Sequence, residues 1–360
     1  MGIKTDVRIM EDNISSVRAE VYVIGTYASG ECSALLLYIN NSVRYTIVID
    51  SCERDLDKLR KYVFEPKGIT SVDFICWTHP HEDHTKGITK LIKEYSSKDT
   101  ILLTPIELYR AKEKLTRASI RAFSSIENIG FDGEEYEHLE DGILSETKEY
   151  VEIENLRKTG YKGINIDTSE CKLIYNSYYK DGISKKATMS IEAYAPIKDV
   201  LTRNSSIDKL NNNDFSIVLS VDINGSKFIF GSDIENISIS KIKERCDIFQ
   251  NVMFAKIPHH GGKSGKGFID LIEDDNNPKC YVTTVYSNTN KTNPCKDILD
   301  LYKKRNGNVY CTNEKHFKTE KQAEDFGIVV TQCDLIPGVF EGKGIKQVMV
   351  EKKGDAYQYF

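Results

Sequence analysis

The chain has 360 residues, a formal net charge of −5 and a hydrophobic content of 40%, which is enough apolar material for a large core. The negative charge argues against the broad basic surface with which proteins bind duplex nucleic acid. No apolar run reaches the roughly 18 residues that span a bilayer, and the first residues lack the apolar segment of a signal peptide. Nine scattered cysteines without a Cys-x-x-Cys pair indicate neither a zinc ribbon nor a disulfide framework. We therefore expect a cytoplasmic protein that does not associate with membranes.

The first half of the chain begins with β-rich runs and then alternates between helices and a buried strand. Three strands are predicted at Glu20–Ile24, Ala34–Ile39 and Tyr45–Ile49, with Asn40 and Asn41 as a turn. The buried strand is Val72–Trp77. Apolar residues at helical spacing predict helices at Asp55–Phe64, Thr85–Ser96 and Leu108–Ile129.

The second half of the chain contains further strands and one clear helix, Asp297–Lys304. The predicted strands are Ser190–Tyr194, Ser216–Val221, Lys227–Phe230, Val252–Pro258, Cys280–Val285, Gly327–Thr331 and Lys346–Glu351. Residues 130–205 have the least regular pattern. Acidic residues are concentrated between Asp132 and Glu154, where an exposed helical insertion would repel a polyanion.

One motif, Thr78-His-Pro-His-Glu-Asp-His84, follows directly after the buried strand Val72–Trp77. It places three histidines and one aspartate within six residues. Such a polar group neither builds a core nor improves solubility, so a plain surface cluster of histidines explains it poorly. Imidazole nitrogen and carboxylate oxygen suit a divalent ion such as Zn, Fe or Mn. The alternating spacing puts His79 and His81 on one side of an extended turn, so that Asp83 and His84 can face a second ion.

This His-x-His-x-Asp-His string resembles the signature of the metallo-β-lactamase fold, and three other segments support the resemblance in chain order. Asp50 ends a β-rich run, Lys227–Asp233 resembles the strand whose terminal aspartate bridges two metals, and Val252–Pro258 leads into His259-His260-Gly-Gly. Each candidate follows a predicted strand, where open α/β folds place their sites. The resemblance implies an α/β fold, a four-layer αββα sandwich. Its core would cover about 18–104 and 205–335, with a helical insertion at about 105–204 and a C-terminal β extension at about 336–360.

A finer resemblance is to the ComEC-like branch, named after the soluble domain of a DNA-uptake protein. Four segments carry it, namely Phe74–His84, Pro258-His-His-Gly, Asn213–Leu219 and Val309–Thr312. The chain departs from the branch at Gly262, where serine is usual, and at Thr292-Asn-Pro294, where the branch often has Gly-His-Pro. The early Val-Gly-Gln-Gly-Asp element is only loosely matched by Ile24-Gly25 and Gly30-Glu31. These departures concern the substrate more than the fold.

The resemblance also implies a ligand set for two divalent ions, Zn or Mn, with Asp233 as the bridge and Asp50 orienting a ligand histidine. The expected ligands are His79, His81, Asp83, His84, Asp233 and His259. The superfamily's third ligand at the first site is usually a histidine, but only His138 lies between the motif and Asp233, and it fits a plain surface residue better. Asp214 or Asn213 is the alternative, and an oxygen ligand there would favour Mn over Zn.

The roles of the paired histidines stay open at the level of sequence. We expect His259, at the strand end, to bind metal, and His260 to face the substrate and protonate a leaving group; the reverse assignment is nearly as good. Asp83 and His260 are thus the predicted catalytic residues. Lys263 and Ser264, in the glycine-rich turn that follows, are predicted to bind an anionic substrate.

Three functions are compatible with these residues. The first is a phosphodiesterase or nuclease that acts on nucleic acid or nucleotides through a metal-bridging hydroxide. The second is a metallo-hydrolase of a carboxylic ester, lactone or thioester. The third is a redox or non-catalytic member of the fold. The redox type normally has glutamate where His81 stands, which argues against a redox function. A non-catalytic member is disfavoured because nearly every metal ligand is present, so hydrolysis is favoured.

Overall fold

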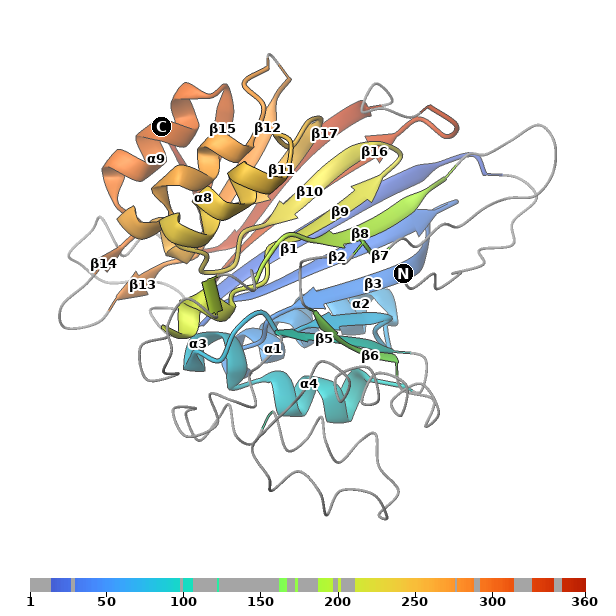
Figure 1. The fold of residues 1–360 in the computed structure, drawn as a ribbon. Helices are drawn as coiled ribbons and strands as arrows, with labels where there is room; N and C mark the ends of the chain where they lie inside the picture. Colours follow the sequence, from blue (N-terminus) through green and yellow to red (C-terminus); the bar gives the residue numbers. More distant parts are fainter. Residues whose placement is uncertain are drawn as a thin grey trace.

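Two eight-stranded sheets lie face to face in the computed structural model, and helices cover the outer face of each sheet (Figure 1). The chain is therefore a four-layer αββα sandwich, and the predicted fold class is confirmed. The described residues are 14–26, 30–97, 100–105, 122, 162–166, 172–173, 187–196, 200–201, 211–275, 277–287, 292–313, 326–339 and 345–360.

The first sheet has the strand order β17-β16-β1-β2-β3-β4-β5-β6. Its strands are β1 Val17–Thr26, β2 Cys32–Ile39, β3 Ser42–Ile49, β4 Phe74–Cys76, β5 Ile101–Pro105, β6 Lys162–Ile166, β16 Phe326–Leu335 and β17 Ile345–Gly354. Pairing is antiparallel from β17 to β3 and parallel from β3 to β6. Asn40 and Asn41 have φ of 51° and 63° and form the predicted turn between β2 and β3, a conformation that asparagine tolerates.

The second sheet has the order β18-β15-β12-β11-β10-β9-β8-β7. Its strands are β7 Lys172–Leu173, β8 Met189–Ala193, β9 Leu219–Ile223, β10 Ser226–Phe230, β11 Val252–Lys256, β12 Lys279–Thr283, β15 Gly307–Cys311 and β18 Tyr357–Tyr359. Strands β10, β11, β12 and β15 are parallel, so their carboxyl ends share one edge. A separate hairpin pairs β13 Tyr286–Ser287 with β14 Thr292–Asn293.

The two sequence segments predicted to lie outside the core both contribute strands to the sheets. In the range 105–204, β6 extends the first sheet, while β7 and β8 extend the second. After residue 336, β17 becomes the edge strand of the first sheet and β18 that of the second. The predicted helix Leu108–Ile129 and the acidic stretch with His138 lie outside the described residues, apart from residue 122.

Strand alternation divides the apolar side chains among three cores. Phe74 and Phe228 point between the two sheets, where both are fully buried. Ile75, one residue after Phe74, faces the helices on the first sheet, and Ile229 faces those on the second. This period-two division is what places a core on each side of both sheets.

The helices follow the strands that they cover. They are α1 Glu53–Leu59, continued by the π-helical η1 Arg60–Phe64 and by α2 Glu65–Lys67, then α3 Glu82–Thr85, α4 Ile88–Tyr95, α8 Asn236–Arg245, the 3₁₀ helix η7 Lys263–Leu271 and α9 Lys296–Lys304. The predicted helix Thr85–Ser96 is interrupted at Lys86 and Gly87. Among the described helices, none combines the length and apolar character needed to cross a bilayer.

Replacing Phe228 by alanine should destabilise the protein by about 3–5 kcal/mol, because the change opens a cavity between the two sheets. Urea unfolding of both proteins measures the difference. Phe360→Ala is the matched control, since that phenyl ring is 85% exposed and its loss should change stability by less than about 0.5 kcal/mol. Equal losses in the two variants would contradict the inter-sheet core.

Candidate metal centre

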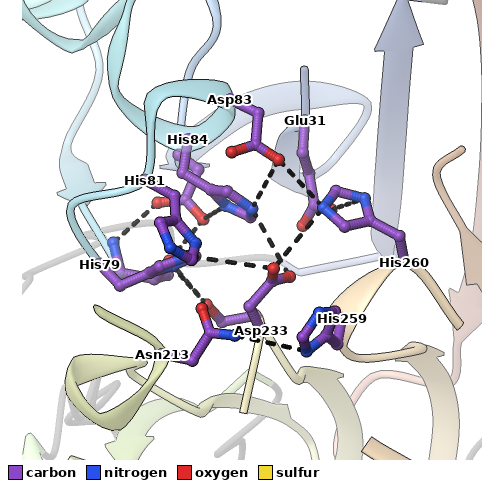
Figure 2. Close-up of polar contacts among 12 residues, drawn as sticks. Glu31, His79, His81, Asp83, His84, Asn213, Asp233, His259 and His260 are labelled. Carbon is purple, nitrogen blue, oxygen red and sulfur yellow. Dashed lines mark hydrogen bonds and ion pairs between the residues drawn. The ribbon is translucent and has the colours of Figure 1, made fainter. Parts of the chain in front are cut away.

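The polar residues of the centre come from strand ends of both sheets, which meet at one edge of the sandwich (Figure 2). Asp50 follows β3, the His79–His84 motif follows β4, Asp233 follows β10, and His260 follows β11. Four residues at these ends have the left-handed backbone conformation that is rare outside glycine, with φ of 56°, 48°, 51° and 52°. They are Asp50, Ser232, His259 and His260. Such backbone strain is concentrated at functional sites in proteins.

Among the residues that the structure describes, three overlapping groups of side chains have ligand atoms within 4.8 Å of one another, close enough to hold a metal ion. The groups are Glu31 with His84, Asp233 and His260; Asp50 with His79 and His84; and His79 with His81 and Asp233. Asp233 belongs to two of the groups. Its Oδ1 lies 3.5 Å from His84 Nε2, and its Oδ2 lies 3.6 Å from His260 Nε2 and 4.0 Å from His79 Nε2.

Several donor atoms in this cluster are buried without a hydrogen bond. They include His84 Nε2 and Asp233 Oδ1, which face one another at 3.5 Å. Burying such atoms unpaired is costly, since proteins satisfy nearly all of their buried polar groups. A cation between these imidazoles and carboxylates would satisfy them, and the mixed nitrogen and oxygen donor set suits Zn or Mn.

The buried imidazoles differ in their protonation. Burial, together with the neighbouring His84 and His81, lowers the pKa of His79, and burial lowers the pKa of His81. Burial would also lower the pKa of His84, but Asp50 and the other nearby carboxylates outweigh it and raise that pKa well above its ordinary value. Neutral His79 and His81 are in the form that binds a metal ion.

The two central carboxyl groups are held ionised. Burial would raise the pKa of Asp233, but His260 and His84 hold it well below its ordinary value. Likewise, His84 and His260 outweigh the burial of Asp83 and lower its pKa. Both side chains are therefore anions at neutral pH, as metal ligation requires.

Asp50 contacts the histidines of the cluster from the Nδ1 side of their rings, directly or through Thr78, and both of its carboxylate oxygens already accept hydrogen bonds. Its Oδ1 accepts from the backbone N–H of Thr78 at 2.7 Å, and its Oδ2 accepts from the Thr78 hydroxyl at 2.6 Å. The same Oδ2 lies 2.7 Å from His84 Nδ1, and Thr78 Oγ lies 3.0 Å from His79 Nδ1. One carboxylate thus orients both rings so that each Nε2 faces the cluster.

The two adjacent histidines point to different neighbours, and the placement is the reverse of the preferred sequence assignment. His260 Nε2 lies 3.1 Å from Asp83 Oδ2, inside the ligand cluster. His259 Nδ1 instead lies 3.2 Å from Glu235 Oε1 and 2.9 Å from Ser264 Oγ. Left-handed φ at both positions turns the chain sharply, which separates the two rings.

The sequence offers Asp214 or Asn213 as the oxygen ligand of the first metal site, and the two side chains have different contacts in the structure. Asp214 Oδ2 accepts from the backbone N–H of Asn211 and caps the 3₁₀ helix η5, Asn212–Phe215, so this carboxylate serves the local turn. Asn213 donates from Nδ2 to Glu235 at 3.0 Å, while its Oδ1 is buried without a hydrogen bond. Asn213, not Asp214, therefore has the available oxygen.

The two substrate-binding residues predicted in the turn after His260 also have different surroundings. Ser264 lies against His259, whereas Lys263 is exposed at the start of η7. Lys263 lines a hollow of about 450 Å³ together with Lys266 and Lys304.

Three residues of the centre were not predicted from sequence. They are Glu31, Glu235 and Thr284. Glu31 had a weak signal, since Gly30-Glu31 stands where the ComEC-like branch has Gly-Asp, and Glu235 follows the predicted Asp233 by two residues. Thr284 lies just past β12, a strand that was predicted, but a lone threonine has no distinguishing pattern.

Fold and site together define an αββα sandwich with a buried histidine and aspartate centre at its strand ends. No protein-family model matches the sequence, and no curated protein matches it. Matching solved structures include the metallo-β-lactamase-fold protein YhfI from Bacillus subtilis, at 12% identity and a TM-score of 0.31, over 67% of this chain and 70% of that chain.

Two further solved structures match at similar levels. A diphosphatase from the PhnP family shares 8% identity at a TM-score of 0.38, over 94% of this chain and 99% of that chain. Zn²⁺-bound PqqB from Methylobacterium extorquens shares 7% identity at a TM-score of 0.33, over 66% and 71% of the two chains. These values are too low to transfer an activity, so the chemistry of this chain follows from its own side chains.

Replacing Asp50 by asparagine should weaken divalent-ion binding about 10- to 100-fold, because the carboxylate that orients His84 and His79 is lost. Calorimetric titration of metal-stripped protein with Zn²⁺ or Mn²⁺ measures the change. Asp73→Asn is the matched control, since Asp73 also accepts a backbone N–H, from Thr46 at 2.7 Å, but precedes β4 instead of following it. Undiminished affinity in the Asp50 variant would contradict the orienting role.

Proposed function

We propose that the chain is a dinuclear metal-dependent hydrolase, and that its substrate is a phosphodiester of nucleic acid or a nucleotide. The observation that carries the proposal is the place of Asp233. This buried carboxylate belongs to two ligand groups, one with His79 and His81 and one with Glu31, His84 and His260. A carboxylate shared in this way is suited to bridge two ions.

In this proposal, each ion has its own ligands beside the shared Asp233. His79 and His81 would hold the first ion, with Asn213 Oδ1 as a further oxygen ligand. Asp83, His84 and His260 would hold the second. Two divalent ions at this position activate water at neutral pH and offset the negative charge of an in-line displacement at phosphorus. The amide oxygen and the carboxylates make Mn a good alternative to Zn.

The chain's own residues at the edge of the centre would handle the substrate. His259 is 9% exposed, more than His79 or His84, and its ring lies against Ser264 and Glu235. Glu235 and Ser264 fix the ring through Nδ1, and the ring would act on a phosphate oxygen or a leaving group. His259 therefore takes the substrate-facing role first assigned to His260.

Metal-stripped protein supplied with Mn²⁺ or Zn²⁺ should hydrolyse bis-p-nitrophenyl phosphate, and Asp233→Ala should abolish that turnover, because the variant lacks the bridging carboxylate. Release of p-nitrophenol measures the rate, and thermal unfolding of the variant confirms that it is folded. Turnover in Asp233→Ala equal to that of the parent protein would refute the assignment.

The same assay separates the proposed substrate class from its main alternative. Absence of phosphodiester hydrolysis with two ions bound would overturn the phosphodiesterase proposal. Hydrolysis of p-nitrophenyl acetate or a thioester under those conditions would then assign the centre to carboxyl chemistry, which uses the same ions to activate water.

Alanine substitutions at the paired histidines should have different effects. His260→Ala should lose the second ion, because it removes a ligand that lies 3.1 Å from Asp83. His259→Ala should retain both ions but lower kcat/KM about 10- to 100-fold, the effect of losing one hydrogen bond to a charged substrate. Metal content by plasma mass spectrometry and steady-state kinetics measure the two effects. Loss of metal in His259→Ala alone would restore the sequence-based assignment.

A further inference from the structure

A chain of buried polar contacts runs from Lys256 to the back of His260. Lys256, on β11, is 1% exposed and forms an ion pair with Glu31, which is 3% exposed. The hydroxyl of Thr284 donates to Glu31 Oε2 at 2.8 Å. Thr284 Oγ in turn lies 2.7 Å from His260 Nδ1. These contacts use the side of the imidazole that faces away from Asp83 and Asp233.

The chemistry of the chain sets the direction of each hydrogen bond. An ionised Glu31 has no proton to give, so the single hydroxyl proton of Thr284 goes to the carboxylate. The Thr284 oxygen can then only accept, and it accepts from Nδ1–H of His260. The proton of a neutral His260 ring is therefore on Nδ1, and the lone pair of Nε2 points to the ligand cluster.

Glu31 is itself held in place by its backbone. Its N–H donates to the carbonyl of Asp83 at 3.1 Å, so Glu31 also fixes the backbone of the metal motif. The preceding Gly30 packs so closely on Asp55 and Cys52 that an added Cβ would overlap both side chains. Only glycine allows the chain to pass there, and this passage brings Glu31 from the loop between β1 and β2 to the second sheet.

We propose that Lys256, Glu31 and Thr284 form a positioning relay that fixes the tautomer and orientation of His260, and thereby the affinity for the second ion. The inference rests on the proposed function only for the existence of that ion. The buried ion pair alone would also fit a purely structural role, since breaking a buried pair destabilises a protein. The threonine between the pair and the histidine is what distinguishes the two roles.

The test compares two substitutions of Thr284. Thr284→Val keeps the shape but removes the hydroxyl, and Thr284→Ser keeps the hydroxyl. Zn²⁺ binding to metal-stripped protein is measured by competition with a chromophoric chelator, which resolves the two binding steps. We expect the second Zn²⁺ to bind about 10- to 100-fold more weakly to Thr284→Val, with the first step unchanged and the serine variant close to the parent.

Thr331→Val is the matched control, because Thr331 is fully buried on β16 and its hydroxyl lies 3.1 Å from Cys280 Sγ, within the sheets. It loses one buried hydroxyl in the same way but should bind both ions normally. Thermal unfolding of all variants separates loss of affinity from loss of fold.

Each result has a distinct meaning. The relay would be overturned if Thr284→Val bound the second Zn²⁺ as tightly as the parent protein. It would also be overturned if the substitution weakened both binding steps alike, or if the parent protein bound only one ion. A parent that binds two ions but does not hydrolyse bis-p-nitrophenyl phosphate would overturn the proposed function, while the Thr284 series would still support or refute the relay.

Discussion

The constraint on which this structure depends is the burial of opposite charges where the two sheets meet. Asp50, His79 and His84 are fully buried and Asp233 is 3% exposed, although isolated charges cost several kcal/mol each to remove from water. The imidazoles and carboxylates compensate one another, as the raised pKa of His84 and the lowered pKa of Asp233 show. Replacing such groups by apolar residues is often neutral or stabilising, so their convergence supports the proposed metal centre.

The parts of the fold that follow from periodicity were predictable. The predicted strands Tyr45–Ile49 and Val252–Pro258 are largely apolar runs followed directly by polar residues, and parallel strands place those ends at one edge. Helix α8 was missed because Ile237 and Ile239 alternate with serines, which is the spacing of a strand. Gly265 and Gly267 similarly obscured η7, since glycine disfavours helices.

The site was predictable only where its residues are neighbours in sequence. His79 to His84 form one motif, and its chemistry can be inferred directly. The choice between His259 and His260 depends on left-handed backbone at both positions, and histidine, although enriched in that conformation, adopts it too rarely for the sequence to indicate it. Glu31 lies more than 200 residues before Thr284, and only the folded chain brings their side chains to 2.8 Å. A contact of this kind leaves no local pattern.

The histidines are oriented by two carboxylates that reach them in different ways. Asp50 contacts His84 within the first sheet and its adjoining motif. Glu31 also starts from the first sheet, but it reaches His260 through Thr284, which lies just past β12 of the second sheet, and it pairs with Lys256 on β11 of that sheet. The orientation of one metal ligand thus depends on the relative position of the two sheets. Packing between the sheets and ion affinity are then linked, because a shift of one sheet against the other would displace His260 from Asp83.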